Sequence, residues 1–181
     1  MKVGFNNASK ENYAPNRSRT GRKFLIPALF WNSRFHRNPA PTVWPAILDH
    51  DSARILSFIA KHLDEDIYFG VATRKACDGS KNGVSRVTHL WADIDWKDFP
   101  RGQAEADEAI RSFPLKPSII VSSGHGYHLY WRLRETTLAS IEIEGYLKGI
   151  AKALGADRAA AELARILRVP GRFNYHASRQ R

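Results

Sequence analysis

Short apolar stretches, separated by polar or glycine- and proline-containing segments, run through the chain from residue 67 onward. Apolar runs of roughly four to eight residues that end in turn-forming residues are typical of buried β-strands. Four stretches predict strands: 67–72, 84–96, 118–121 and 127–133. The last two flank the turn Ser122–Gly126, so we expect them to pair as a hairpin.

Apolar residues recur at helical spacing between and after these strands. A first helix is expected to begin at Asp51 or Ser52, which are good capping residues, and to include Leu63 on its apolar side. Three further helices are predicted: 103–112, 136–154 and 157–167. Strands mixed with helices predict an α+β fold in which the helices pack on a sheet.

Length, composition and cysteine content limit the class of protein and the compartment in which we expect it. The chain of 181 residues is long enough for one domain with a core, and no apolar run approaches the roughly 20 residues of a membrane span. The N-terminus lacks an apolar signal core, so we expect a cytoplasmic protein without a membrane partner. Cys77 is the single cysteine, which excludes an internal disulfide and a cysteine-based zinc site.

Positive charge is concentrated near the N-terminus. The net charge is +10, and residues 1–46 carry eight Lys or Arg against one acid, Glu11. Residues 1–22 are polar and without periodicity, which predicts a basic, disordered tail ahead of a domain over 23–181. Such a tail adds salt-dependent attraction to the phosphates of a nucleic acid.

Asp93 and Asp95 are the first candidates for chemistry. They lie two apart in an apolar strand, so their carboxylates project from the same face. Adjacent carboxylates repel each other, and a divalent cation such as Mg²⁺ or Mn²⁺, which prefers oxygen ligands, removes the conflict. Asp-x-Asp alone is also common at solvated strand ends, and the pair therefore needs further support.

The segment from Ser122 to His128 gives that support. Its glycines let the backbone approach a ligand closely, and its hydroxyls and amides suit phosphate oxygens. His128 begins the following strand, which makes it a candidate for a triphosphate contact, with Tyr130 and Arg132 on the same face. His125 is expected to be a loop residue.

Asp157 is the third acidic candidate, at the start of the predicted last helix, where it could also be a plain N-cap. Glu162 is an alternative acid nearby. Arg165 and Arg168 are three residues apart and are expected on one helical face, where they could hold phosphates or a template strand.

The order of these motifs resembles the archaeo-eukaryotic primase (AEP) superfamily, in particular its RepB-like and phage or plasmid primase-polymerase branch. The resemblance covers roughly residues 67–175 and rests on Asp-x-Asp, then Ser-Gly-x-Gly-x-His, then an Asp followed by Arg-x-x-Arg-x-Pro-Gly. It implies a single AEP-type domain with a mixed, mostly antiparallel central sheet and an RRM-like catalytic unit.

The resemblance also implies roles for individual residues. The catalytic acids that hold two Mg²⁺ or Mn²⁺ ions would be Asp93, Asp95 and Asp157. The residues that bind the nucleotide would be His128, Ser123, Gly126, Arg74 and Arg168. The residues that contact nucleic acid would be Arg165, Arg172 and Asn174. The family often has Asn-x-Lys after Pro-Gly, whereas this chain has Asn174-Tyr175-His176 and lacks that lysine.

The activity implied is that of a template-dependent nucleotidyltransferase, a DNA primase or primase-polymerase, acting in the replication of a phage, plasmid or other mobile element. Its partners would be a single-stranded DNA template and nucleoside triphosphates. The 181 residues leave no room for the helicase domain that such proteins often carry, so a separate helicase is a further expected partner. Two alternatives stay open: a non-catalytic module that binds single-stranded DNA, and a metal-dependent glycosyltransferase that uses Asp-x-Asp.

Overall fold

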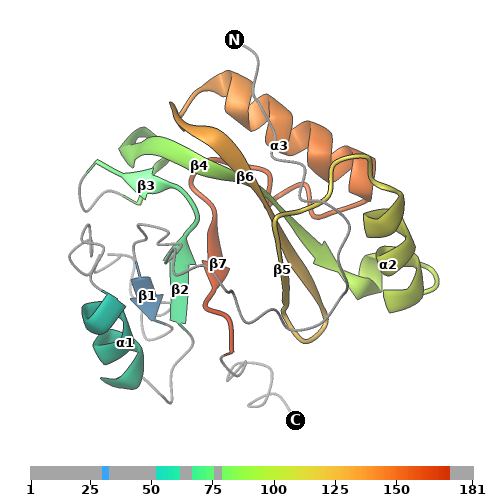
Figure 1. Ribbon diagram of the computed structural model, residues 1–181, viewed down its shortest axis with the longest axis horizontal. Helices are drawn as coiled ribbons and strands as arrows, with labels where there is room; N and C mark the ends of the chain where they lie inside the picture. The colour runs from blue at the N-terminus through green and yellow to red at the C-terminus, as the bar shows by residue number, and fades with distance from the viewer. Residues whose placement is uncertain (1–29, 33–51, 62–66, 76–78, 172–181) are drawn as a thin grey trace.

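The computed structural model describes residues 30–32, 52–61, 67–75 and 79–171 (Figure 1). Within them lie three helices: α1 (Ser52–Lys61), α2 (Gln103–Ser112) and α3 (Ile141–Leu154). The strands are β1 (Phe30–Asn32), β2 (Ile67–Gly70), β3 (Thr73–Arg74), β4 (Val84–Asp95), β5 (Ile119–Ser122), β6 (Gly126–Leu138) and β7 (Ile166–Arg168). The predicted α+β class is confirmed.

The strands form two sheets, and every described pairing is antiparallel. One sheet has four strands in the order β3-β4-β6-β5, and the other has three in the order β1-β2-β7. The predicted hairpin is present as β5 and β6, which pair from Ile119 opposite Tyr130 to Ser122 opposite Tyr127. Figure 1 shows β7 passing between β2 and the long strands β4 and β6.

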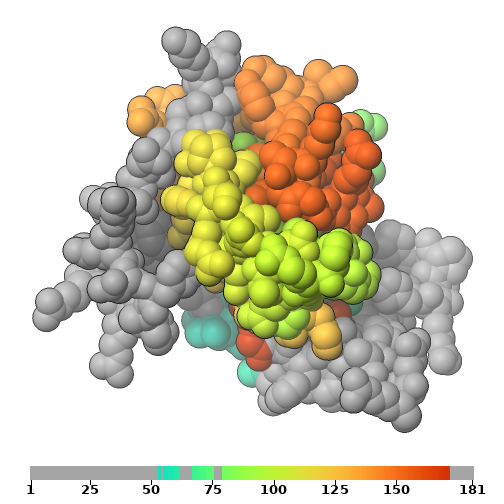
Figure 2. All heavy atoms as spheres, turned by 90° about the vertical axis from the view of Figure 1, so that its right-hand side faces the viewer, coloured from blue at the N-terminus to red at the C-terminus, as the bar shows by residue number. Residues whose placement is uncertain are grey.

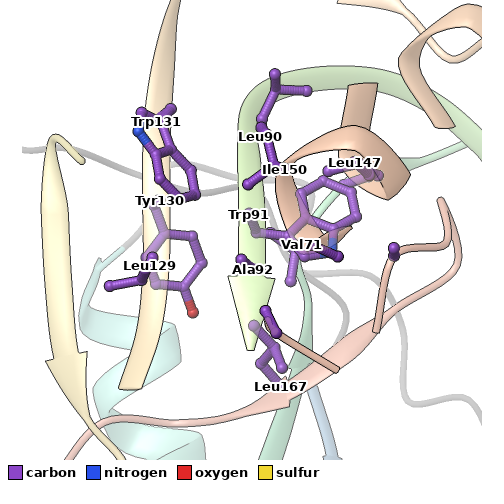
Figure 3. Packing of buried hydrophobic residues seen from close by; sticks show 14 of the residues in the cluster. Val71, Leu90, Trp91, Ala92, Leu129, Tyr130, Trp131, Leu147, Ile150 and Leu167 are labelled. Atoms are coloured by element: carbon purple, nitrogen blue, oxygen red, sulfur yellow. The ribbon is translucent and has the colours of Figure 1, made fainter. Parts of the chain in front are cut away.

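The two faces of the four-stranded sheet have different coverings. Leu90, Ala92 and Ile94 of β4 are buried on the face that α3 and α2 cover, where Figure 3 shows Leu90 near Leu147 of α3. On that side the indole N–H of Trp131 donates to the carbonyl of Leu115, 2.8 Å away, beside α2. Each large apolar side chain buried in this way contributes roughly 1.5–3 kcal/mol to stability.

The opposite face is covered by the segment that follows α3. The indole N–H of Trp91 donates to the carbonyl of Ala160, 3.0 Å away, and both residues are buried. The space-filling view from the right of Figure 1 shows α2 in yellow-green, with the orange and red-orange chain of α3 and its following segment beside it (Figure 2). On this face, which Trp91 shares, His89, His128 and Tyr130 are buried.

Two of the predicted helices differ from the structure. Residues 136–138 extend β6, and the helix begins only at Ile141, because the Ser140 hydroxyl caps it by accepting from the Ile143 N–H at 3.3 Å. The predicted helix 157–167 is wrong. Its first part is a series of tight turns, and its last part is strand β7, which pairs with β2.

The reason is a competition for backbone hydrogen bonds. The N–H of Asp157 donates to the carbonyl of Asp93 at 2.8 Å, and the carbonyl of Arg165 accepts from the N–H of Val71 at 3.2 Å. These tertiary bonds, together with the contact between Trp91 and Ala160, replace the helical bonds that an alanine-rich segment favours locally. The remaining predicted elements agree with the structure to within a few residues.

His89 makes the stability of this fold depend on pH. Burial, and secondly the charge of Arg132, lowers the pKa of His89 from 6.5 to about 4. The folded protein therefore holds a neutral imidazole, whereas the unfolded chain takes up a proton as the pH falls below 6.5. We predict that His89 costs on the order of 2 kcal/mol of unfolding free energy between pH 7 and pH 4.5. Urea unfolding of wild type and His89→Gln at both pH values tests this, and an equal loss in the two proteins would contradict it.

Candidate active site

Asp93 is at the centre of the candidate site, near the end of β4. One of its carboxylate oxygens, Oδ2, accepts a hydrogen bond from Nη2 of Arg165 at 2.9 Å. The other oxygen, Oδ1, lies 3.7 Å from Nε2 of His128, which is opposite Asp93 in the register of β4 and β6. Side chains from three separate parts of the chain thus meet at one carboxylate.

Asp157 joins this group through both its backbone and its side chain. Its N–H donates to the carbonyl of Asp93 at 2.8 Å, which fixes the start of the segment after α3 against the end of β4. Its Oδ1 accepts from the N–H of Ala159 at 2.8 Å, and its Oδ2 lies 3.7 Å from Nη2 of Arg165. The Arg165 guanidinium is therefore shared between Asp93 and Asp157.

Asp95 follows Asp93 on the same face of β4 and pairs with the ammonium group of Lys97. The hydrogen bond to Asp95 and the charge of Asp95 raise the pKa of Lys97, with smaller contributions from Asp98 and Asp157. Asp93 and Asp157 thus share the charge of Arg165, and Asp95 has Lys97 as its own counter-ion.

The donor chemistry of the site fits a divalent metal. Asp93, Asp95 and Asp157 offer carboxylate oxygens, which Mg²⁺ and Mn²⁺ prefer. In the part of the chain that the structure describes, however, no group of three or more His, Cys, Asp or Glu side chains is arranged to hold a metal ion. Arg165 and Lys97 contact the oxygens that a metal would need, so both would have to move aside.

His128 and Tyr130 form the buried side of the site, on the same face of β6. Burial lowers the pKa of His128, partly offset by the negative charge of Asp93. Burial, and secondly the charge of Asp93, raises the pKa of Tyr130. The Nδ1 atom of His128 and the hydroxyl of Tyr130 are both buried and have no hydrogen-bond partner among the described residues. Burial thus leaves these two polar atoms without a hydrogen bond within the described structure.

The turn between β5 and β6 is less suited to phosphate than its sequence indicates. The N–H of Ser123 donates to the carbonyl of Gly126 at 3.0 Å, so this amide closes the turn, and only the exposed side chain of Ser123 is available. Gly126 is buried opposite Asp95, and a Cβ there would lie 1.8 Å from the carbonyl oxygen of Ile94. Close pairing of β4 with β6 requires this glycine.

Arg74 is buried, and backbone carbonyl groups bind its side chain. It is 4% exposed, and its guanidinium donates to the carbonyls of Gly79 and Ser80, both at 2.9 Å, and of Ala164 at 2.8 Å. These bonds join the loop before β4 to the residue that precedes Arg165. The structure therefore gives no support to the expected contact of Arg74 with a triphosphate, and it assigns this side chain to positioning the segment that carries Arg165.

Arg165 and Arg168 do not share a helical face, because no helix forms there. Arg165 points to the carboxylates, whereas Arg168, in β7, lies over the ring of Tyr68 at 5.3 Å and donates to the Tyr68 hydroxyl at 3.2 Å. The charge of Arg168 still reaches His128 and helps to lower its pKa. Both arginines are thus near the site, but Arg165 contacts the carboxylates whereas Arg168 is held against Tyr68.

Glu162 lies in a different environment from Asp157. Its carboxylate is 3.8 Å from the ammonium group of Lys81, which also pairs with Glu144 on α3. Asp157, by contrast, shares Arg165 with Asp93. Of these two acids, Asp157 is the one linked to Asp93 through Arg165. Arg172 and Asn174 lie outside the described residues.

Lys97 was missed by the sequence reasoning. The sequence does contain a signal for Lys97: it is a basic residue two positions after the second aspartate, at the end of a strand. The chain turns back toward the carboxylates there. Tyr130 was expected on the His128 face, but nothing in the sequence indicated that its hydroxyl would be buried without a partner.

A groove of about 470 Å³ lies elsewhere, between α2 and the β5–β6 hairpin. It is lined by Asp107, Ile110, Arg111, Ile120, Ser122 and Tyr127. Tyr127 and His128 are neighbours in β6 and point to opposite faces, so the groove is on the helix-covered side and does not include the carboxylates.

Comparisons with known proteins bear on the fold. No family model matches the sequence. The structure aligns with the AEP domain of the primase-polymerase of cyanophage S-2L with a TM-score of 0.58, over 83% of this chain and 76% of that one, at 14% identity. The chain has the AEP fold.

The chain is also similar in sequence to a replication protein. A replication protein of Clostridium perfringens is 31% identical over 122 residues, which span 61% of this chain. The match covers 30% of the length of that relative. The resemblance to the AEP superfamily that the motifs indicated is thus confirmed at the level of the fold.

In addition, none of the described helices has the length and apolar character needed to cross a membrane.

Gly126→Ala tests the structural role of the glycine in this AEP fold. The added methyl group would collide with the Ile94 carbonyl, so β4 and β6 would have to separate at Asp95. We expect a loss of stability of roughly 1–3 kcal/mol, typical of overpacking, measured by chemical denaturation. Gly145→Ala is the control, because a Cβ at this glycine of helix α3 meets nothing within 4 Å. Equal stability of Gly126→Ala and wild type would refute the requirement.

Proposed function

We propose that this chain is the catalytic domain of a template-dependent nucleotidyltransferase, a DNA primase or primase-polymerase that acts in the replication of a phage, plasmid or other mobile element. The AEP fold, shared with a primase-polymerase domain, and the similarity to a replication protein support this proposal. The observation that carries it is that Asp93 and Asp157, from two distant segments, share Arg165 beside the buried His128, with Asp95 two residues further along the same strand as Asp93.

The proposed reaction is the attack of a 3′-hydroxyl on the α-phosphate of an incoming nucleotide, with release of pyrophosphate. Asp93, Asp95 and Asp157 would hold two Mg²⁺ or Mn²⁺ ions. Bound there, the ions would lower the pKa of the attacking hydroxyl and stabilise charge on the leaving oxygen. No protein side chain is then needed as a general base.

The chain itself would supply the contacts to the triphosphate. His128 is buried beside Asp93, and its Nδ1 atom is without a partner in the described structure, which suits a bond to a phosphate oxygen. Arg168 brings a positive charge within reach of His128. The exposed hydroxyl of Ser123 lies at the turn that leads into the same strand.

The proposed partners are nucleoside triphosphates and a single-stranded DNA template, with a separate helicase. The basic residues 1–46, together with Arg165, Arg172 and Asn174, would attract the template through its phosphates. The aromatic and basic character of this chain also suits the alternative of a non-catalytic module that binds single-stranded DNA. The pairing of Asp93 and Asp95 with cationic side chains favours that alternative. The AEP fold favours nucleotidyl transfer over sugar transfer.

Substitution of the aspartates separates catalysis from binding. We expect Asp93→Asn and Asp95→Asn to lower metal-dependent incorporation of labelled nucleotides on a single-stranded template by roughly 100-fold or more, because charge stabilisation at the reacting phosphate is lost. Binding of a single-stranded oligonucleotide should persist.

Asp98→Asn is the matched control, since Asp98 is an exposed acid in the turn just after β4. It should retain incorporation close to that of wild type. Full incorporation by Asp95→Asn would overturn the proposed site, and binding of DNA without any incorporation by the wild type would favour the non-catalytic module.

A further inference from the structure

Arg165 holds two of the three proposed metal-binding carboxylates at once. Its Nη2 atom is 2.9 Å from Oδ2 of Asp93 and 3.7 Å from Oδ2 of Asp157. The side chain of Arg165 is 26% exposed, and those of Asp93 and Asp157 are 21% and 38% exposed. The guanidinium therefore lies in a partly buried position between the two acids, where it acts as their counter-ion.

A guanidinium and a divalent cation cannot both take this position. A cation that bound Oδ2 of Asp93 and Oδ2 of Asp157 would take the place of the guanidinium, because the two positive charges would repel each other in a partly buried site. Metal binding at these two oxygens thus requires Arg165 to leave. Once released, a guanidinium in this place would lack a counter-ion until another anion arrived.

The local structure indicates which anion that would be. The Nε atom of Arg165 is buried and has no partner among the described residues, and neither has Nδ1 of His128, which is across Asp93. Arg168 adds positive charge in the same region. A planar guanidinium matches a phosphate group with two parallel hydrogen bonds. The backbone carbonyl of Arg165 is held by Val71 and its neighbour Ala164 by Arg74, so only the side chain needs to move.

We propose that Arg165 is a displaceable counter-ion: a divalent metal replaces it at Asp93 and Asp157, and the freed guanidinium then binds the triphosphate of the incoming nucleotide. Metal and nucleotide binding are coupled through this one side chain, in addition to any direct contact between them. The inference rests on the proposed function, and it changes the expected role of Arg165 from template binding to nucleotide binding.

Metal binding without nucleotide tests the first step. The affinity of the full chain for Mn²⁺ alone is measured by titration calorimetry for wild type, Arg165→Gln and Arg158→Gln. We expect Arg165→Gln to bind Mn²⁺ about fivefold more tightly or better, because a competitor has been removed. Arg158 is exposed and adjacent to Asp157, so Arg158→Gln measures the effect of losing one nearby positive charge. Affinity in Arg165→Gln that is no tighter than in Arg158→Gln overturns the displacement.

Nucleotide binding tests the second step. The ligand is a nucleoside triphosphate with a non-cleavable bridge between the α and β phosphorus atoms. Its affinity for each protein is measured once with Mn²⁺ and once with EDTA. With Mn²⁺ we expect Arg165→Gln to bind this nucleotide about tenfold more weakly than wild type does, because the variant has lost a charged hydrogen bond. With EDTA the two proteins should bind it equally, because Arg165 is then held by the carboxylates. An equal loss under both conditions, or a loss of single-stranded oligonucleotide binding alone, overturns this step.

The folded state of each variant is checked by thermal unfolding, and Arg165→Lys serves as a second variant if Arg165→Gln does not fold. Lysine keeps the charge but cannot form the paired hydrogen bonds, so its nucleotide affinity with Mn²⁺ should still fall. Unchanged affinity would overturn the inference. These binding measurements are independent of catalysis: tighter Mn²⁺ binding by Arg165→Gln in a protein that incorporates no nucleotide would support the arginine inference and contradict the proposed function.

Discussion

The register between β4 and β6 is the constraint on which the site depends. It puts Asp93 opposite His128, Trp91 opposite Tyr130 and Asp95 opposite Gly126. A shift by one residue would turn every side chain of β4 to the other face, and the carboxylates would then point into the apolar layer under α2 and α3. The close approach of Gly126 to the Ile94 carbonyl fixes this register at the end where the candidate site lies.

The second constraint is electrostatic. Three carboxylates near one another in a partly enclosed place are unfavourable unless positive charge lies beside them. In this structure Arg165 supplies it to Asp93 and Asp157, and Lys97 supplies it to Asp95. On the proposed function, these two cationic side chains are the ones that a metal would have to displace.

The segment after α3 connects the two sheets and brings Arg165 to the site. Near its start, the N–H of Asp157 is bonded to the end of β4, and its last residues pair with β2 as β7. Arg74 anchors the middle through the carbonyl of Ala164. A buried arginine that was expected to contact a ligand thus has the role of placing another arginine, and the site depends on contacts well outside its own side chains.

Local patterns in the sequence determined most of the sheet and the aspartate pair, since alternation along one strand decides which side chains share a face. Asp93, Asp95 and His128 could be named because each lies in or beside a strand with a clear apolar pattern. The segment 157–167 could not be predicted, because its alanine-rich sequence favours a helix, whereas hydrogen bonds to Asp93, Val71 and β2 come from distant parts of the chain. Only the tertiary structure decided that Arg165 meets Asp93 and Asp157, that Glu162 faces Lys81, and that Arg74 is buried, because each depends on the relative position of the two sheets.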